Sequence, residues 1–336
     1  MPLPQFELVE ILADGKFHSG SELGEKWNVS RTCVANSIKK LNTLGLQVFS
    51  VRGKGYKLFS PLCLLNADRI RAAIPDELPS CSLELDIFPA IDSTNSYLLG
   101  KRLPFCEGKS SYHVSFAEMQ NEGRGSRGRK WVSPFGSNLY FSIATTWQGG
   151  VHGVQGLSLV AGLAIAKTLQ AEGIKHVGVK WPNDVQIRGK KVAGVLVELK
   201  GDASGLIQVV VGVGLNLKMS AETMREVEQP WCALESAGFE QTKRNELAGK
   251  LVGQLITYLE LFNKVGLSAL AEEWATYDVS LAERVSVVSQ SGVISGIGRG
   301  IDEEGCFVVD TGEKQIHLRS GEVSLRVGSG RNDSAD

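Results

Sequence analysis

The sequence has few of the residues that bind metals or form disulfides. Its six cysteines lie far apart, none belongs to a C-x-x-C pair, and the five histidines are isolated. These spacings exclude a disulfide framework and a zinc site, and they predict reduced thiols in a cytoplasmic protein. The cysteines are Cys33, Cys63, Cys81, Cys106, Cys232 and Cys306.

Long apolar runs and a net charge are also missing. No apolar run approaches the ~20 residues of a membrane span, and the N-terminus has neither the basic head nor the apolar core of a signal peptide. The net charge of −1 gives no overall attraction to nucleic acid, so such binding requires a local patch. The 336 residues, 43% hydrophobic and 22% charged, are enough for two or three globular domains with no membrane association.

The first 62 residues have the pattern of a helix-turn-helix. Apolar residues from 6 to 12 predict a first short helix that ends at Asp14-Gly15. Ser19 and Glu22 have capping-box spacing for a second helix over residues 22–27, and Ser30 is a good N-cap for a third. Two short helices joined by a tight turn are typical of this motif.

The outward side of the third helix and the following hairpin, residues 48–58, are basic. Residues 1–60 hold eight Lys and Arg against five acidic residues, a local balance of +3. A packing module with a solvated basic face would have the same charge, but the wing-like hairpin favours DNA binding by a dimer on a two-fold symmetric site. The predicted DNA-binding residues are Ser30, Arg31, Thr32, Asn36, Lys39, Lys40, Arg52 and Lys54.

Residues 123–131, which we call the glycine–arginine loop, predict an anion site. Three glycines alternate with three arginines and a lysine, and Trp131 ends the run. Glycine frees backbone N–H groups to face a ligand, and arginine donates to phosphate or carboxylate. The loop also fits G-x-G-x-x-G, but Pro134 and the β-rich run 138–143 replace the helix that a dinucleotide fold needs there. An exposed basic turn is the alternative.

Other polar residues stand at the ends of predicted elements. The run 92–95 opens a helix after the predicted strand 83–88, and it suits a polar ligand head unless Asp92 or Ser93 acts as an N-cap alone. Asn183 and Asp184 could hold a ribose, a phosphate or Mg²⁺. Lys191 begins an apolar strand, so its ammonium needs an anionic partner. Asn216 is the one polar side chain in residues 209–217 and needs a hydrogen-bond partner.

The remaining pattern predicts an α+β multidomain chain with a central mixed sheet. Strands are expected near 114–118, 177–181, 185–199 and 207–217, and the helices 157–169, 247–262 and 267–274 cover them. Five short β-runs between 284 and 326 predict a small C-terminal β-barrel. We expect domains at 1–62, 66–276 and 277–327, and a disordered tail at 328–336.

Several motifs in this order resemble the bifunctional biotin protein ligases that also act as biotin operon repressors. The similarity covers almost the whole chain. It includes residues 17–20, 53–56, 92–95, 123–131, 180–184, 191–194, 214–216 and 321–326. The resemblance implies a winged helix-turn-helix, a central domain of class II synthetase-like fold and an SH3-like C-terminal barrel.

The resemblance also implies a two-step reaction with biotin, ATP and Mg²⁺. The biotin carboxylate attacks the α-phosphorus of ATP, and biotinyl-5′-AMP then gives its biotinyl group to a lysine of the biotin carboxyl carrier protein of acetyl-CoA carboxylase. The adenylate-bound homodimer would bind a palindromic operator upstream of biotin synthesis genes. Two anions must approach, so cations are needed where charge develops.

By the same resemblance, each polar motif has a role. Lys191, Arg124, Arg127 and Arg129 would be catalytic, and Asp184 would bind Mg²⁺. Trp131, Asn183 and Asn216 would contact the adenylate. Biotin would be held by Ser93, Thr94, Asn95, Gln120, Arg124, Gly125, Ser126 and Lys191.

One position departs from the family pattern. Arginine is usual where this chain has Ser126, and a hydroxyl cannot replace a guanidinium beside a phosphate. The lost contact is worth about 1–3 kcal/mol, so the adenylate would leave faster or form more slowly unless Arg127 or Arg129 compensates. Three alternatives remain open: a biotin-sensing repressor without catalysis, a lipoate or octanoate ligase of the same superfold, and a ligase with a vestigial DNA-binding domain.

Overall fold

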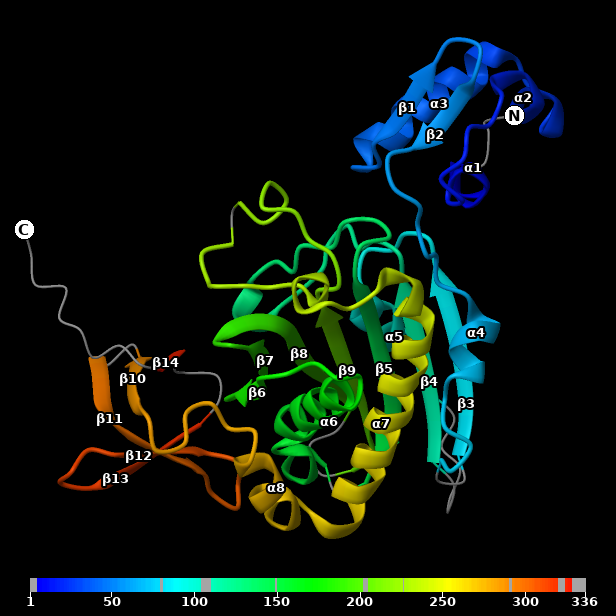
Figure 1. The fold of residues 1–336 in the computed structure, drawn as a ribbon. Helices are drawn as coiled ribbons and strands as arrows, with labels where there is room; N and C mark the ends of the chain where they lie inside the picture. The colour runs from blue at the N-terminus through cyan, green and yellow to red at the C-terminus, as the bar shows by residue number, and fades with distance from the viewer. Residues whose placement is uncertain are drawn as a thin grey trace, which may run out of the picture.

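The computed structural model describes residues 5–78, 81–103, 110–148, 150–201, 205–225, 227–289, 292–319 and 324–327. The predicted tail at 328–336, residues 321–323 of the terminal motif and Cys106 lie outside these ranges. The helix-turn-helix part and the C-terminal sheet lie on different sides of a central body, as Figure 1 shows.

The N-terminal part is a winged helix-turn-helix, as predicted. It comprises α1 (Gln5–Leu12), α2 (Gly20–Lys26), α3 (Arg31–Thr43) and the hairpin β1 (Val48–Val51) and β2 (Gly55–Leu58). We call residues 5–58 the helix-turn-helix unit. The Ser19 and Ser30 hydroxyls each accept a backbone N–H at 3.2 Å, so both residues are N-caps, although Ser19 accepts from Ser21 and not from Glu22 as a capping box requires. Helix α2 begins two residues before the predicted Glu22, because the chain turns helical directly after its cap.

The central body is a seven-stranded mixed sheet in the order β3-β4-β5-β9-β8-β7-β6. Among the described strands, β3 and β4 form its one parallel pair, and the other pairs are antiparallel. This confirms the mixed sheet. Its strands are β3 (Cys81–Phe88), β4 (Ser110–Ala117), β5 (Leu139–Trp147), β6 (Val177–Lys180), β7 (Asp184–Ile187), β8 (Lys190–Gly201) and β9 (Ile207–Leu215).

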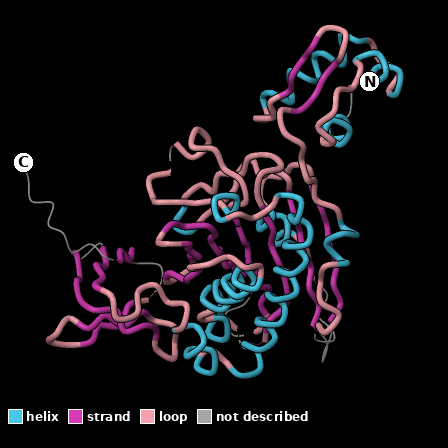
Figure 2. The backbone as a smooth tube through the Cα atoms, in the orientation of Figure 1, coloured by secondary structure: helices cyan, strands magenta, loops and turns pink. Residues whose placement is uncertain are grey.

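Helices cover both faces of this sheet. Helices α6 (Leu157–Ala171) and α7 (Arg244–Val265) lie across one face (Figure 2), where Ile143 and Val209 belong to the main core. The next residue along each strand, Ala144 and Val210, packs instead against Leu98 of α5 (Thr94–Gly100). Neighbouring strand residues point to opposite faces, so α5 covers the other side.

Short elements complete this body. Helix α4 (Ala67–Ala72) follows the linker from the helix-turn-helix unit and packs on α7. The helix predicted over 267–274 is instead a 3₁₀ turn, Ser268–Leu270, followed by α8 (Ala271–Ala275), a common way for a helix to begin. The other 3₁₀ turns are Ser126–Gly128, Val151–Val154, Leu234–Ala237 and Gln241–Lys243.

The C-terminal part is a five-stranded antiparallel sheet at the predicted positions. The strands are β10 (Arg284–Ser289), β11 (Gly292–Ile301), β12 (Phe307–Asp310), β13 (Gln315–Leu318) and β14 (Ser324–Val327), in the order β13-β12-β11-β10-β14. Trp181 joins this sheet to the central body, since its indole N–H donates to the Gly305 carbonyl at 3.0 Å. None of the described helices is both long and apolar enough to cross a bilayer.

Candidate active site

A cavity of about 410 Å³ opens between the N-terminus of α5, the glycine–arginine loop and strands β8 and β9. This volume suits a small organic ligand. Three predicted site residues, Arg127, Asp184 and Asn216, are not among the residues that line it. The predicted residues that do line it are Ser93, Thr94, Asn95, Gln120, Arg124, Gly125, Ser126, Arg129, Trp131, Asn183 and Lys191.

The start of α5 carries a buried polar cluster. Ser93 is the N-cap, and its hydroxyl accepts the Ser96 N–H at 3.4 Å. Gln120 accepts from both the backbone N–H and the hydroxyl of Thr94, at 2.9 and 3.2 Å. The Ser142 hydroxyl lies 2.5 Å from the Asn95 side-chain oxygen. The buried Ser93, Thr94, Asn95 and Ser142 and the half-buried Gln120 are fixed by these contacts, so they present a defined set of donors and acceptors to the cavity.

The glycine–arginine loop folds back on itself. The Gly125 N–H donates to the Arg129 carbonyl at 2.7 Å, and the Trp131 N–H donates to the Gly123 carbonyl at 2.8 Å. Its tip is a 3₁₀ turn in which Arg127 has a left-handed φ of 60°. This places Arg127 at the turn, whereas Arg129 and Trp131 line the cavity.

Arg124 and Arg129 are held by other side chains and by the backbone. Arg124 donates to the Glu198 carboxylate at 2.7 Å, and Asn95 donates to the same oxygen at 2.8 Å. Arg129 donates to the carbonyl of Ser126 at 3.2 Å and to its hydroxyl at 3.0 Å. Ser126 therefore holds the neighbouring guanidinium, and Glu198 ties the loop to strand β8.

Lys191 has the anionic partner that its burial predicts. Its ammonium lies 2.6 Å from the Asp184 carboxylate, and the two side chains are 10% and 16% exposed. The ammonium forms an ion pair with this oxygen, but the angle between them does not meet hydrogen-bond geometry. It also lies 5.3 Å from the centre of the Trp131 ring. The predicted anionic partner of Lys191 is thus a residue of the protein, Asp184.

More positive charge surrounds this ion pair. Burial lowers the pKa of Lys180, Asp184 opposes this effect, and the nearby charges of Lys191, Arg326 and Arg129 add to it. Cations that lower the pKa of a lysine mark a site of positive potential, where an anion would be stabilised. Lys180 and Glu198 were not predicted as site residues. Like Lys191, each of them is a charged residue within an apolar strand, and that signal is visible in the sequence.

The two predicted asparagines hold backbone segments. Asn183 donates to the Val195 carbonyl at 2.8 Å, and Asn216, 2% exposed, donates to the Cys232 carbonyl at 3.2 Å. The predicted need of Asn216 for a partner is confirmed. The Trp131 indole N–H differs, because it is buried without a hydrogen-bond partner among the described residues. An acceptor on a ligand in the cavity would satisfy it.

Glycines in the strands make room for these side chains. A Cβ added at Gly212 would lie 2.1 Å from the Asn95 side-chain oxygen, and one at Gly214 would lie 2.3 Å from the Trp131 ring. A Cβ at Gly194 would lie 3.1 Å from the Lys191 side chain. Side chains of the site therefore approach the backbone closely at Gly212 and Gly214, where any larger residue would clash.

All eight predicted DNA-binding residues are exposed. Ser30 and Arg31 also have local contacts, since the Ser30 hydroxyl caps α3 and Arg31 donates to the Ser21 hydroxyl. In the wing, Lys54 lies 5.9 Å from the centre of the Phe17 ring. An exposed basic helix beside a basic wing fits contact with phosphates.

Three family models match successive parts of the chain. They are an HTH domain over residues 4–57, the Biotin/lipoate A/B protein ligase family over 87–216 and the Biotin protein ligase C terminal domain over 281–326. The bifunctional ligase/repressor BirA of Salmonella typhimurium is 40% identical, over 95% of this chain and 96% of its own. The BirA of Escherichia coli K12 is 39% identical over the same shares.

Relatives named as ligases match a shorter part of the chain. The biotin–[acetyl-CoA-carboxylase] ligase of Mycobacterium tuberculosis is 31% identical, over 71% of this chain and 88% of its own. Among solved structures, the biotin protein ligase of Aquifex aeolicus in complex with biotin and ATP superposes with a TM-score of 0.61 and is 28% identical. That match covers 73% of this chain and 99% of the other.

Proposed function

Because the chain belongs to the family of the bifunctional ligase/repressor BirA, we propose that it is an ATP-dependent biotin protein ligase and a transcriptional repressor. In the first step a biotin carboxylate oxygen bonds to the α-phosphorus of ATP, and pyrophosphate leaves. In the second, a lysine amine of the biotin carboxyl carrier protein of acetyl-CoA carboxylase attacks the acyl carbon. An amide forms, and AMP leaves with the bonding electron pair.

One observation carries the ligase assignment: the cavity joins a neutral polar cluster to a cationic region. Asn95 lies over Gly212, and Trp131 lies over Gly214, two residues further along the same strand. That separation is about 7 Å. A ligand could therefore place a neutral ring with donors and acceptors among Ser93, Thr94 and Asn95 and its acid group near Lys191.

The cationic residues would then bring two anions together. Lys191 is positioned to neutralise the junction of carboxylate and phosphate, and Arg124, Arg127 and Arg129 supply further positive charge from the loop. Preorganised cations of this kind stabilise the charge that develops on a transferring phosphoryl group. Trp131, with its unsatisfied N–H, would face the adenylate.

The two asparagines would shape the nucleotide side of the cavity. Asn183 and Asn216 hold the backbone at residues 195 and 232. We expect Asp184, whose carboxylate pairs with Lys191 at 2.6 Å, to be the Mg²⁺ ligand, because Mg²⁺ is often bound by one carboxylate together with substrate phosphates. Bound there, Mg²⁺ would neutralise phosphate charge. Ser126 gives the chain one guanidinium fewer than an arginine at this position would, so we expect weaker retention of the adenylate.

The repressor role rests on the winged helix-turn-helix unit. We expect the adenylate-bound chain to form a homodimer and to bind a palindromic operator upstream of biotin synthesis genes, since two-fold symmetric sites match such dimers. Helix α3 and the wing would contact the DNA. The protein would act in the cytoplasm, and biotin supply would set the degree of repression.

Transfer of labelled biotin to an apo carrier domain tests the ligase. Pyrophosphate release on addition of biotin and ATP is expected, whereas a sensor without catalysis would release none. Lipoate and octanoate, offered in place of biotin, should not be transferred. A gel shift with DNA from upstream of the biotin synthesis genes, with and without the adenylate, tests the repressor. A ligase with a vestigial DNA-binding domain would transfer biotin but leave that DNA unshifted.

A further inference from the structure

The glycine–arginine loop is anchored in the helix-turn-helix unit. Its stems are residues 118–119 before the loop and 135–138 after it, and the Gly136 N–H donates to the Glu118 carbonyl at 3.0 Å. Phe135 is 4% exposed, and it packs within the apolar core of the helix-turn-helix unit. Its ring stacks on Phe6 of α1 with 6.2 Å between the centroids. Met119, on the other stem, packs on the same core.

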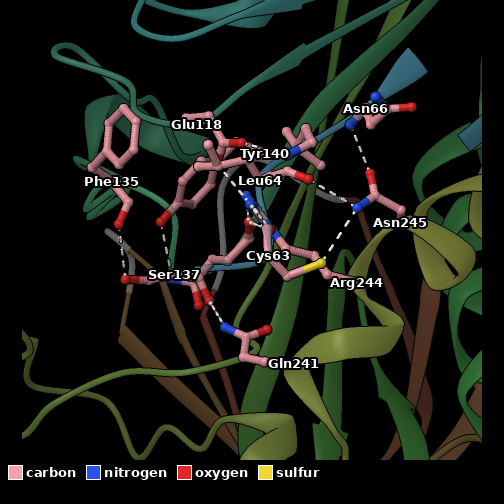
Figure 3. A network of polar contacts seen from close by, with 12 residues as sticks. Cys63, Leu64, Asn66, Glu118, Phe135, Ser137, Tyr140, Gln241, Arg244 and Asn245 are labelled. Carbon is pink, nitrogen blue, oxygen red and sulfur yellow. Dashed lines mark hydrogen bonds and ion pairs between the residues drawn. The ribbon is translucent and has the colours of Figure 1, made fainter. Parts of the chain in front are cut away.

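A buried arginine ties both stems to the linker that enters the central body. Arg244, 0% exposed at the start of α7, donates to the Cys63 carbonyl at 2.9 Å and to the Glu118 carboxylate at 2.6 Å. It also donates to the Asn138 carbonyl at 2.5 and 3.1 Å. Figure 3 shows Cys63 and Glu118 beside Arg244. One guanidinium thus holds the linker and a residue of each stem.

The linker has further contacts on both sides of this arginine. The second oxygen of Glu118 accepts the Leu65 N–H at 2.6 Å. Asn245 donates to the Leu64 carbonyl at 2.9 Å, and its oxygen accepts the Asn66 N–H at 2.8 Å (Figure 3). The backbone groups of the linker are therefore bound by side chains of the central body, and the buried charges of Arg244 and Glu118 satisfy each other.

The stems lead directly to the cavity. Gln120, two residues after Glu118, accepts from Thr94 in the polar cluster and donates to the Ser133 hydroxyl at 3.2 Å. A shift of either stem would move Gln120 and the loop that carries Arg129. The path from α1 to the cavity consists of packed and hydrogen-bonded groups, which is the physical condition for coupling between sites.

We propose that Arg244 and Phe135 are positioning residues that join the ligand loop and the helix-turn-helix unit into one body. Occupancy of the cavity and placement of α1 then influence each other within a single chain, because coupling between sites is reciprocal. The identity of the ligand rests on the proposed function, but the joint itself does not. This coupling acts before any second subunit is bound.

Hydrogen exchange on the ligand-free full chain tests the joint. The amides of Gly125 and Trp131 close the loop on itself, and their exchange rates report its opening. With Phe6→Ala, we expect both amides to exchange about two- to tenfold faster, the effect of losing one aromatic pair. Phe17→Ala is the control, because this ring lies under wing lysines and should leave both rates unchanged. Equal exchange rates of the two amides in wild type and Phe6→Ala would show that the loop and the helix-turn-helix unit are not joined, and would overturn the proposal.

Phe6→Ala could instead unfold the helix-turn-helix unit, which exchange at the α3 amides would reveal. In that case Phe6→Leu replaces it, because leucine keeps the apolar volume and loses only the ring stack. The exchange rates of the Gly125 and Trp131 amides in this variant then test the proposal. Arg244→Lys should retain more loop protection than Arg244→Gln, because lysine keeps the charge beside Glu118. Equal protection in the two variants, at equal melting temperature, would contradict the role of this ion pair.

Adenylate release gives the functional measurement. Wild type is loaded with biotin and MgATP, and the rate of release of biotinyl-5′-AMP is compared with that of Phe6→Ala. We expect release to be faster by the factor seen in exchange, with an unchanged rate constant for transfer at saturating carrier. Unchanged release beside faster exchange would show that the joint does not reach the ligand. If wild type forms no adenylate, the proposed function fails, while the exchange experiment still decides the joint.

Discussion

Replacing Lys191 with alanine separates a structural role of this side chain from a chemical one. Its ammonium pairs with Asp184 at 2.6 Å, where the side chains are 10% and 16% exposed. Removing one partner of a buried ion pair costs about 3–5 kcal/mol, and this pair keeps some solvent, so the lower end applies. A loss of about 3 kcal/mol lowers the melting temperature of a domain of this size by about 6–12 °C. The double variant Lys191→Ala, Asp184→Ala leaves no unpaired charge and should regain most of that stability.

Catalysis should not recover with stability. Loss of a preorganised charge at the reacting phosphate reduces the rate by about 10²–10³-fold, and removing Asp184 does not restore it. Adenylation is measured as pyrophosphate release with biotin and ATP, beside thermal unfolding of the same samples. Asp184→Ala alone completes the cycle and gives the contribution of the carboxylate. Lys190→Ala, at the exposed neighbouring lysine, is the control and should match wild type in both measurements.

The outcome that refutes this reasoning is specific. If the double variant releases pyrophosphate at nearly the wild-type rate, then Lys191 serves only to balance Asp184, and the cation is not needed for the reaction. If Lys191→Ala melts like wild type, the ion pair contributes nothing to stability, and the assigned burial cost is wrong.

Three further predictions concern the loop and the sheet edge. Glu198→Gln removes the charge that holds Arg124 of the loop, so the adenylate should be released about 5- to 30-fold faster. The exposed Glu235→Gln is the control, and equal release rates in the two variants would contradict the role of Glu198. Ser126→Arg adds a guanidinium and should slow release about tenfold, whereas equal rates would make this serine inconsequential. Burial raises the pKa of Asp86, but hydrogen bonds from Tyr97, Lys101 and His113 lower it further, so the net pKa lies below 3.8. These bonds therefore stabilise the folded protein above pH 3.8, and this stabilisation is lost as the pH falls. Asp86→Asn should flatten the acid limb of melting temperature against pH; an unchanged limb would rule out this linkage.

Most of the architecture could be predicted because its signals are local. The caps at Ser19 and Ser30, the glycine-bounded strands and the alternation of the C-terminal runs each depend on a few adjacent residues. Lys191 could be predicted to need a negative partner for the same reason. Its partner could not be identified, since Asp184 comes within reach only through a register shift between β7 and β8.

The long-range contacts of the site left no local signal. Arg124 and Glu198 are 74 residues apart, and Arg244 lies 181 residues after Cys63. Phe135 looks like an ordinary apolar residue after a loop, and no periodicity shows that it enters the core of another unit. Side chains that connect separate elements are selected by the assembled fold, so they become visible only when that fold is known.

Strands β8 and β9 shape the ligand cavity through the side chains they omit. Gly194, Gly212 and Gly214 each leave a volume that Lys191, Asn95 or Trp131 occupies. In a saturation mutagenesis screen, even alanine should fail at 212 and 214, whereas alanine in place of the buried neighbours Val211 and Val213 causes no clash and should be less damaging. Such a pattern of tolerance at alternate positions would show where the side chains of the cavity wall press against the sheet.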